Sequence, residues 1–125
     1  MSEPVTAYTL LLYLAGPMQS WGSRSRFDDR DTHLEPTRSG ILGLLCCACG
    51  VERSNTKELA RLNTGIRRIG VRVDAPGRVA RDYHTAQRVI NAAGKGESNV
   101  VSTRHFLADA RFLVALESGD RAFLE

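Results

Sequence analysis

Two short apolar segments, one near each end of the chain, most constrain how it can fold. Residues 7–14 (AYTLLLYL) stop at an Ala-Gly-Pro turn, and residues 112–116 (FLVAL) form the second run. A membrane-spanning helix needs roughly 18 apolar residues, so both segments are predicted to be buried β-strands. Because residues 1–6 contain no lysine or arginine, the first run is also not the core of a secretory signal. We therefore expect a cytoplasmic protein with no membrane contact.

Between these two strands the pattern changes from helical to extended. Residues 37–50 begin with threonine and serine as candidate caps and are apolar on nearly all sides, which predicts a helix buried on most of its faces. Residues 55–63 predict a second, short helix, with Asn55 or Thr56 as its cap. Residues 66–74 alternate, with arginines on one side, as in a half-exposed strand. Residues 75–77 (Ala-Pro-Gly) predict a turn. Residues 78–104 predict a long hairpin with a glycine-containing tip.

The order of these elements points to a fold class. A strand, two helices, a strand, a hairpin and a further strand fit an α+β sandwich of the ferredoxin-like class with a long β-hairpin. The length of 125 residues suits one domain, residues 1–125. Residues 120–125 have the pattern of a helix that has only begun, so we expect the C-terminal half-unit to be missing. This fold hosts many functions and decides none.

The charge of the chain is segregated along the sequence. There are 17 lysines and arginines against 14 acidic residues, for a net charge of +3, and 15 of the 17 cations are arginine. Residues 61–104 hold nine cations and three anions, or +6, which leaves −3 for the remainder. A guanidinium is a planar fork suited to phosphate and to stacking on bases, so a phosphate-rich partner is expected. A GC-rich genome would favour arginine as well.

A long irregular segment, residues 16–37, precedes the first helix, and loops of this length in compact domains are often functional. Gln19 can both donate and accept hydrogen bonds. Trp21 could stack on a base or anchor the loop to the core. The following helix begins with Pro-Thr-Arg-Ser-Gly, where Arg38 and Ser39 add donors to a helix N-terminus that binds phosphate readily. Ordinary helix capping explains the same residues.

A third cluster lies in the hairpin, at residues 81–88 (RDYHTAQR). It combines a tyrosine ring, an imidazole, an amide and two guanidiniums, and proteins recognise single-stranded RNA with side chains of these kinds. The same residues allow a metal-free ribonuclease, with His84 as general base at a 2′-hydroxyl and Lys95 or His105 supporting charge on the phosphate. A purely structural role is the third interpretation.

Metal and cofactor chemistry are not expected. Asp28, Asp29 and Asp31 alternate with arginines, which favours a solvated, self-paired loop over a magnesium site. The three cysteines at positions 46–49 lie in an apolar helix, where cysteine packs as a small hydrophobe. With no second cluster, neither a disulfide framework nor a complete zinc site is expected. The motifs of catalytic triads and metalloproteases are absent from the sequence, so no catalytic residue is predicted.

Four segments in this order resemble the Cas5 family of CRISPR-associated proteins, and within it the subunit of the type I-E surveillance complex, Cascade. They are LAGPMQSWG (14–22), PTRSGILGLLCCACG (36–50), RDYHTAQ (81–87) and VVSTRHFLADARFLVALE (100–117). Each segment alone is weak, but the ordered set is specific and the resemblance covers nearly the whole chain.

The resemblance implies a ferredoxin-like (RRM-like, RAMP-type) domain whose hairpin "thumb" spans about 78–104. Such proteins cap the 5′ handle of the CRISPR RNA (crRNA) and help to assemble the complex for antiviral defence. They dock against the backbone subunits (CasC) and near the large subunit (CasA), which inspects target DNA. A different subunit cuts the precursor RNA in type I-E complexes, so a noncatalytic binder is expected. A type I-C branch does cleave RNA, which leaves a metal-independent endoribonuclease that processes precursor crRNA as the alternative.

Mapped onto this sequence, the segments 14–22 and 36–40 are expected to line the handle pocket together with the hairpin. Lys95 and Asn99, near the hairpin tip, are expected to contact a neighbouring subunit or the guide. The family continues to roughly twice this length, beyond the last predicted strand. The residues predicted to bind RNA are Gln19, Trp21, Arg24, Arg26, Arg38, Ser39, Arg81, Tyr83, His84, Arg88 and Arg104.

Overall fold

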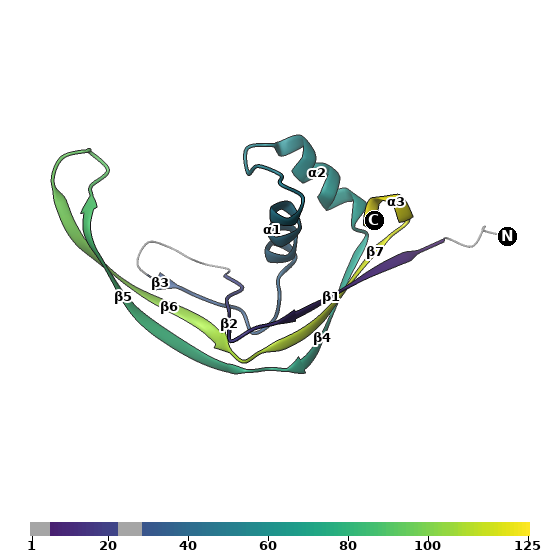
Figure 1. Ribbon diagram of the computed structural model, residues 1–125, viewed down its shortest axis with the longest axis horizontal. Coiled ribbons are helices and arrows are strands. Elements are labelled where there is room, and N and C mark those ends of the chain that lie inside the picture. The colour runs from purple at the N-terminus through teal and green to yellow at the C-terminus, as the bar shows by residue number, and fades with distance from the viewer. Residues whose placement is uncertain (1–5, 23–28) are drawn as a thin grey trace.

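The computed structural model describes residues 6–22 and 29–125. Strands β1 (Tyr8–Ala15), β7 (Arg111–Ser118) and β4 (Arg68–Ala75) form an antiparallel sheet in the order β1-β7-β4. Both apolar runs at the ends of the sequence lie in this sheet, where they are direct neighbours (Figure 1). The prediction that each is a strand is confirmed.

A second sheet is built around a long hairpin. Strands β5 (Arg78–Ile90) and β6 (Glu97–Ala108) pair along most of their length, and β6 also pairs with the short strands β2 (Met18–Gln19) and β3 (Asp29–Arg30). The hairpin curves away from the first sheet and extends beyond the helices (Figure 1). We call β5 and β6 the hairpin arm, and the β1-β7-β4 sheet with its helices the body.

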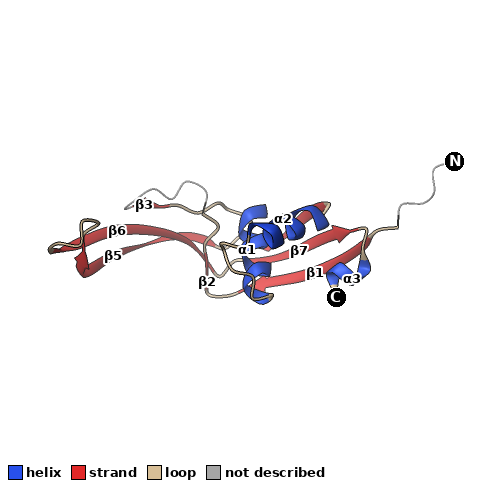
Figure 2. Ribbon diagram, turned by 90° about the horizontal axis from the view of Figure 1, so that it is seen from above, coloured by secondary structure: helices blue, strands red, loops and turns tan. Residues whose placement is uncertain are grey.

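All three helices lie on one side of the first sheet, α1 (Arg38–Ala48) and α2 (Thr56–Gly65) over its middle and α3 (Arg121–Leu124) at the end where β7 stops (Figures 1 and 2). None of the helices in the described part of the chain is long and apolar enough to cross a membrane. The strands and helices together confirm the predicted α+β composition, and the β1-β7-β4 sheet is antiparallel.

Side-chain alternation in β1 and β7 builds the core of the body. Successive residues of a strand point to opposite faces, so the even-numbered residues of both strands turn towards the helices. Val114 and Leu116 are fully buried against Ile41 of α1 and Ile66 after α2. Leu107 and Phe112 form an adjoining cluster at the base of the hairpin arm. Burial of these apolar side chains is the main source of stability for the body.

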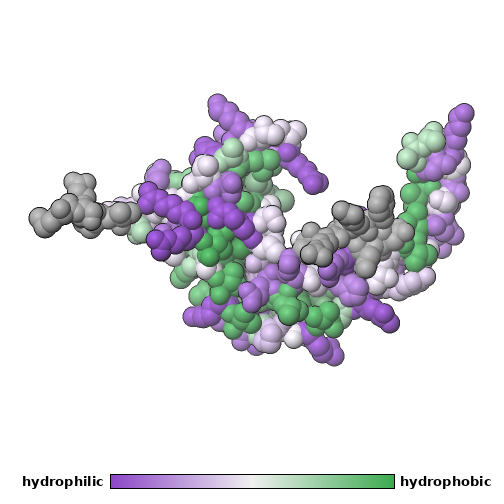
Figure 3. All heavy atoms as spheres, turned by 180° about the vertical axis from the view of Figure 1, so that it is seen from behind, coloured by the Kyte–Doolittle hydropathy of each residue, from purple (hydrophilic) through white to green (hydrophobic). Residues whose placement is uncertain are grey.

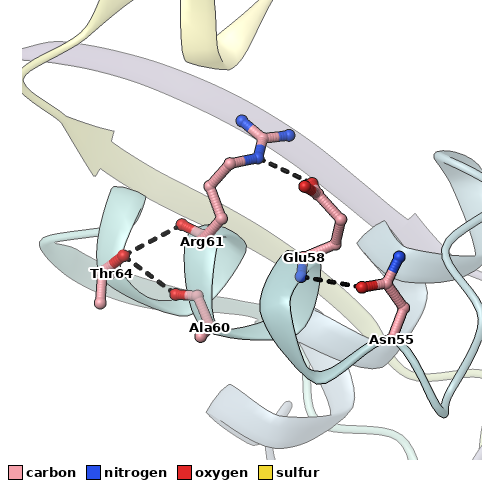
Figure 4. Close-up of polar contacts among 5 residues, drawn as sticks. All are labelled: Asn55, Glu58, Ala60, Arg61 and Thr64. Carbon is pink, nitrogen blue, oxygen red and sulfur yellow. Dashed lines mark hydrogen bonds and ion pairs between the residues drawn. The ribbon is translucent and has the colours of Figure 1, made fainter.

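The helix ends follow the capping residues in the sequence. The Thr37 hydroxyl accepts a hydrogen bond from Gly40 N at 3.1 Å, and Asn55 Oδ1 accepts one from Glu58 N at 3.2 Å (Figure 4). These side chains satisfy amides that the first turn of a helix leaves unpaired. The helices predicted over 37–50 and 55–63 are confirmed, with ends that differ by one or two residues.

The burial predicted for α1 is wrong. Only Ile41 and Cys46 of this helix are buried, and Leu44, Cys47 and Cys49 are exposed. The sheet covers one side of α1 and α2 covers part of another, so two layers leave the remaining faces open. The sequence pattern correctly showed apolar residues all round, but it did not show how few elements would cover them.

The hairpin arm begins at a turn that requires glycine. Gly77 has a φ of +70°, and a Cβ there would collide with backbone atoms of Ala108 and Ala110. The turn predicted over residues 75–77 is thus confirmed. The arm ends later than predicted, at Ala108 rather than residue 104, because residues 105–108 still pair with β5. Asp109, with a φ of +58°, then separates β6 from β7.

Candidate nucleic-acid interface

A hollow of about 640 Å³ lies where the loop after β1 meets the hairpin arm. Gln19, Ser20 and Gly22 line it from the loop. The hairpin arm contributes Asp82, His84, Arg104 and His105, and the segment at β3 contributes Arg30 and Asp31. Two of the motifs that the sequence singled out, LAGPMQSWG and RDYHTAQ, therefore meet at one site.

A second hollow of about 200 Å³ adjoins the first along the arm and shares Arg30, His84 and Arg104 with it. Its further lining consists of Ala86, Val89, Val100 and Ser102. We call the two together the hairpin trough. Seen from behind, hydrophobic residues gather on the side of the arm that faces the helices (Figure 3). Near the loop the trough lining mixes charged and polar side chains with Met18 and Phe106, and towards the hairpin tip it consists mainly of alanine and valine.

Strand pairing divides the 81–88 cluster between two faces of the arm. Asp82 lies opposite Arg104, and His84 lies opposite Ser102, and all four line the trough. Because side chains alternate along a strand, Arg81 and Tyr83 belong to the other face. Tyr83 is 71% exposed there. A single RNA-reading cluster of Arg81, Tyr83 and His84 is therefore not what the structure builds.

Arg88 occupies an irregular position in the arm. It has a φ of +57° within a break in the β5–β6 register, and its backbone N–H donates to Asn99 Oδ1 at 3.2 Å. Its guanidinium donates to Glu97 at 2.8 Å, and this hydrogen bond raises the pKa of Arg88. The extra residue of this β-bulge returns Val89 to the trough side. Arg88 and Asn99 thus shape the hairpin.

The turn at the tip of the arm is held by one asparagine. Asn91 Oδ1 accepts from the Lys95 backbone N–H at 3.0 Å, and Asn91 Nδ2 donates to the Lys95 carbonyl. Lys95 thus lies in the turn that joins β5 to β6, as the sequence predicted, and its side chain has no ion pair within the described residues.

Gln19 and Trp21 hold the loop to the body. Gln19 Nε2 donates to Ala110 O at 2.8 Å and Leu14 O at 3.3 Å, while its Oε1 is buried without a hydrogen-bond partner in the described chain. Trp21 packs against both core clusters, and its Nε1 is likewise buried without a partner. Of the two roles open for Trp21, the structure favours the anchor over the stacking platform.

The Pro-Thr-Arg-Ser-Gly segment lies away from the trough. Arg38 donates to Asn63 O at 2.8 Å, Asn63 Oδ1 at 3.1 Å and Ile66 O at 2.9 Å, and so joins the start of α1 to the end of α2. Ser39 lines a different groove, between these helices. The expectation that this segment lines the same pocket as the loop is not met, because its guanidinium is used inside the body. Arg24, Arg26 and Asp28 lie outside the described residues.

The sequence missed Arg30 as a site residue. The aspartate-rich loop was interpreted as self-paired, yet Arg30 forms part of β3 beside Arg104 on β6 and lines both hollows. Only the tertiary pairing of β3 with β6, which connects residues over 70 positions apart, brings these two guanidiniums together. No local pattern signals such a pairing.

Ion pairs reduce the positive field that the sequence predicted for residues 61–104. Four of its nine cations are paired with carboxylates: Arg61, Arg68, Arg72 and Arg88. The other five have no ion pair among the described residues: Arg67, Arg78, Arg81, Lys95 and Arg104. Arg67 directly precedes β4 in the body, and the other four lie on the hairpin arm or in the turn at its tip. Most of the uncompensated charge of this segment is therefore on the arm.

The trough combines groups that suit a single-stranded nucleic acid. Arg30 and Arg104 can bind phosphate, and Asp31 and Asp82 can accept from the amino groups of bases. The side chain of Gln19, predicted to bind RNA, instead holds the loop, because its Oε1 is buried and its Nε2 is bound to backbone carbonyls. His84 can donate to or accept from a base edge or a 2′-hydroxyl. Among the described residues no three histidine, cysteine or acidic side chains are gathered as a metal site would require.

The chain is similar to a protein-family model, to a known protein sequence and to solved structures. A family model described as CRISPR-associated protein (Cas_Cas5) matches residues 9–125. The chain is similar to "CRISPR system Cascade subunit CasD" of Escherichia coli (strain K12), with 39% identity over 117 residues, 86% of this chain and 52% of that protein. The resemblance stated from sequence motifs is confirmed.

Two solved structures are also similar. A chain of a "CRISPR RNA-guided surveillance complex" matches with a TM-score of 0.80 and 40% identity, over 92% of this chain and 50% of that one. A "Crystal structure of Cas protein" matches with a TM-score of 0.62 and 42% identity, over 94% of this chain and 48% of that one. The chain thus spans about half the length of the relatives it matches.

Proposed function

The chain belongs to the Cas5 family of CRISPR-associated proteins, and on that premise we propose that it is a noncatalytic RNA-binding subunit of a type I-E Cascade complex. In this role it caps the 5′ handle of the crRNA and helps to assemble the backbone for antiviral defence. The names of similar proteins support a role in such a complex, because one is a Cascade subunit and another is part of an RNA-guided surveillance complex.

One observation carries the RNA-binding role: residues of the loop after β1 and of the hairpin arm, at least 60 positions apart in sequence, line one trough. In our proposal Arg30 and Arg104 contact phosphates, and His84 and Asp82 contact bases or 2′-hydroxyls. The apolar end of the trough, at Val89 and Val100, accommodates the faces of splayed bases.

The fold supports the same proposal in its finer form. The order β1-β7-β4 with helices on one side supports a ferredoxin-like sheet, and we propose that this is the RAMP-type domain with its thumb. Backbone subunits (CasC) and the large subunit (CasA) are the proposed protein partners, with target DNA contacted indirectly, in the cytoplasm. Lys95, at the arm tip, is the proposed first contact with a neighbouring subunit.

Salt dependence tests the role of the trough. The full chain is titrated into a labelled single-stranded RNA that carries the 5′ handle of a CRISPR repeat, at several salt concentrations. Each phosphate contact on a single strand contributes about −0.7 to the slope of log K against log[salt], so Arg30→Gln and Arg104→Gln should each flatten the slope by about 0.7. Arg81→Gln, on the other face of the same hairpin, should leave the slope unchanged.

Two results would contradict this assignment. An RNA affinity that does not depend on salt excludes the arginines as phosphate contacts. Slopes that remain as in the unsubstituted protein for Arg30→Gln and Arg104→Gln, but flatten for Arg81→Gln, would place the RNA on the opposite face of the arm.

The alternative, a metal-independent endoribonuclease, is favoured by one feature: two imidazoles, His84 and His105, line the same hollow as Arg30 and Arg104. This is the set needed to move a proton from a 2′-hydroxyl and to stabilise the charged phosphate. The test is incubation of labelled repeat RNA with the chain in EDTA. RNA that stays intact while it remains bound supports the noncatalytic role, and cleavage that His84→Ala abolishes supports the enzyme.

A further inference from the structure

Helix α1 has more apolar surface than this chain covers. Nearly every residue from Ile41 to Cys49 is apolar or glycine, a pattern typical of a helix that is buried on all sides. Yet only Ile41 and Cys46 are buried. Ile41 packs against the sheet and Ile66, and Cys46 lies towards α2. The exposed remainder points to contacts that the chain does not make by itself.

Part of this surface forms a groove of about 750 Å³ between α1 and α2. From α1 it is lined by Ser39, Gly43 and Cys47, which are spaced four residues apart and so share one side of the helix. Leu42 and Cys46 deepen the lining on this side, and Val51, Leu59 and Ala60 close the other. The groove is thus a mainly apolar concavity of the size that accepts a few side chains.

Two glycines of α1 show where packing within the chain ends. A Cβ on Gly40 would lie 2.7 Å from the Trp21 ring, so the anchor of the loop explains this glycine. A Cβ on Gly43 would meet nothing within 4 Å among the described atoms. Glycine inside a helix lowers helix stability, and no contact within residues 6–22 and 29–125 offsets that cost at Gly43. Close approach of another molecule would.

The charge at the groove indicates the chemistry of its occupant. Arg53 is the one charged residue in the described lining, and no ion pair engages it within residues 29–125. By contrast, the neighbouring Arg38 is bound to Asn63 and Ile66, and Arg61 is paired with Glu58 (Figure 4). A single cation beside an apolar concavity suits a carboxylate that accompanies an apolar side chain. Nucleic acid would need several phosphate contacts.

We propose that the α1–α2 groove docks a segment of another protein subunit that inserts an apolar side chain beside Gly43 and presents a carboxylate to Arg53. The inference rests on the proposed function only in that the partner belongs to the same complex. It assigns a second contact surface on the body, separate from the trough and the hairpin arm.

The cysteines of α1 give a direct test. Cys47 lines the groove and Cys49 does not, and both are exposed on the same helix. The free chain and the complex purified from cells are each treated with N-ethylmaleimide, and the modified peptides are quantified by mass spectrometry. We expect assembly to slow alkylation of Cys47 by about tenfold or more while Cys49 changes little, because alkylation requires an accessible thiolate.

A substitution that fills the groove gives the second test. Gly43→Leu should fold at least as well as the unsubstituted chain, because the space is empty and leucine is the better helix former. It should weaken association with the partner subunit by about tenfold or more, as overpacking does. Ala48→Leu, which adds bulk to the same helix outside the groove, is the matched control. Arg53→Glu should weaken association as well.

The outcomes separate this inference from the proposed function. Equal alkylation of Cys47 in the free and assembled states, or normal assembly of Gly43→Leu, overturns the groove as a docking site. Suppose that Cys47 is protected in a complex whose RNA affinity does not depend on Arg30 or Arg104. This result supports the groove as a docking site and contradicts the trough as the RNA-binding site. A chain that co-purifies with no other protein overturns both. RNA in place of protein at the groove, shown by crosslinking, overturns the assignment of the partner.

Discussion

The body and the hairpin arm use β-pairing in opposite ways. In the body, β7 lies between β1 and β4, and its Phe112, Val114 and Leu116 are completely buried under the helices. In the arm, β5 and β6 pair over a greater length, yet Val79, Tyr83 and Ile90 are each more than half exposed. The body is thus stabilised by its own core, whereas the outer part of the arm has only its hydrogen-bond ladder.

This difference separates stability from function within one small chain. A two-stranded hairpin by itself is marginally stable in water, so the outer arm gains order from whatever it binds. Most residues of the trough lining lie on the arm, as do several cations without ion pairs and exposed aliphatic residues such as Val79 and Ile90. In this protein, the region that contributes least to the core carries most of the candidate binding surface.

Hydrogen exchange should show the largest contrast between the two regions. Amides of β7 should exchange only through global unfolding, which for a small domain costs about 5–15 kcal/mol, whereas amides near residues 88–98 should open for about 0–2 kcal/mol. Exchange measured by NMR on the free chain checks this. Equal protection in the two regions would show that the arm is stabilised by more than its own pairing.

A core substitution should have the next largest effect. Phe112 is 0% exposed and Tyr83 is 71% exposed, so Phe112→Ala should destabilise the chain by about 3–5 kcal/mol and Tyr83→Ala by less than about 0.5 kcal/mol. Urea unfolding followed by circular dichroism provides both values. A large loss for Tyr83→Ala would mean that the arm packs more tightly than its exposure indicates.

Arg38 should behave as a residue of the body. Its guanidinium donates three hydrogen bonds to Asn63 and Ile66, so Arg38→Ala should cost about 1–2 kcal/mol of stability. The RNA affinity of the folded fraction should not change. Arg121→Ala, which removes an exposed arginine from α3, is the control and should shift stability by less than about 0.5 kcal/mol. If Arg38→Ala lowers the RNA affinity while stability is unchanged, Arg38 belongs to the RNA-binding surface.

The smallest effect is expected at the junction of the body and the arm. Hydrogen bonds from Arg72, and the charges of Arg72 and Arg111, lower the pKa of Asp74. A lowered folded-state pKa contributes stability above the unfolded-state value, near 3.9, and that contribution is lost as the pH falls through the folded-state pKa. An NMR titration should show Asp74 ionising at lower pH than the same carboxyl in urea. Coincident titrations would mean that the ion pair with Arg72 is absent in solution.

Much of the body could be predicted from the sequence, because its signals are local. The apolar runs that became β1 and β7, the caps Thr37 and Asn55, and the Pro76-Gly77 turn each depend on a few neighbouring residues. The hairpin was also predicted, although its end was placed four residues early. Residues 105–108 carry no turn signal that separates β6 from the next strand, and only pairing with β5 shows where the arm ends.

The candidate site was predicted less well, for a physical reason. Gln19, His84 and Arg104 line the trough, but Arg81 and Tyr83 face away from it, and Arg38 and Arg88 are bound within the chain. Residue types in a short segment show which chemistry is available. They do not show on which side of a strand a residue lies once a bulge such as that at Arg88 shifts the register.

The sequence by itself determined the types and order of the elements, the segregation of arginine towards the hairpin and the family, because propensity, periodicity and ordered motifs are properties of the linear chain. The tertiary structure alone decided which arginines are free, that Arg30 joins Arg104, that Trp21 is an anchor and that α1 leaves a groove open. These outcomes depend on pairings between residues distant in sequence, whose energies arise only when the sheets and helices come together.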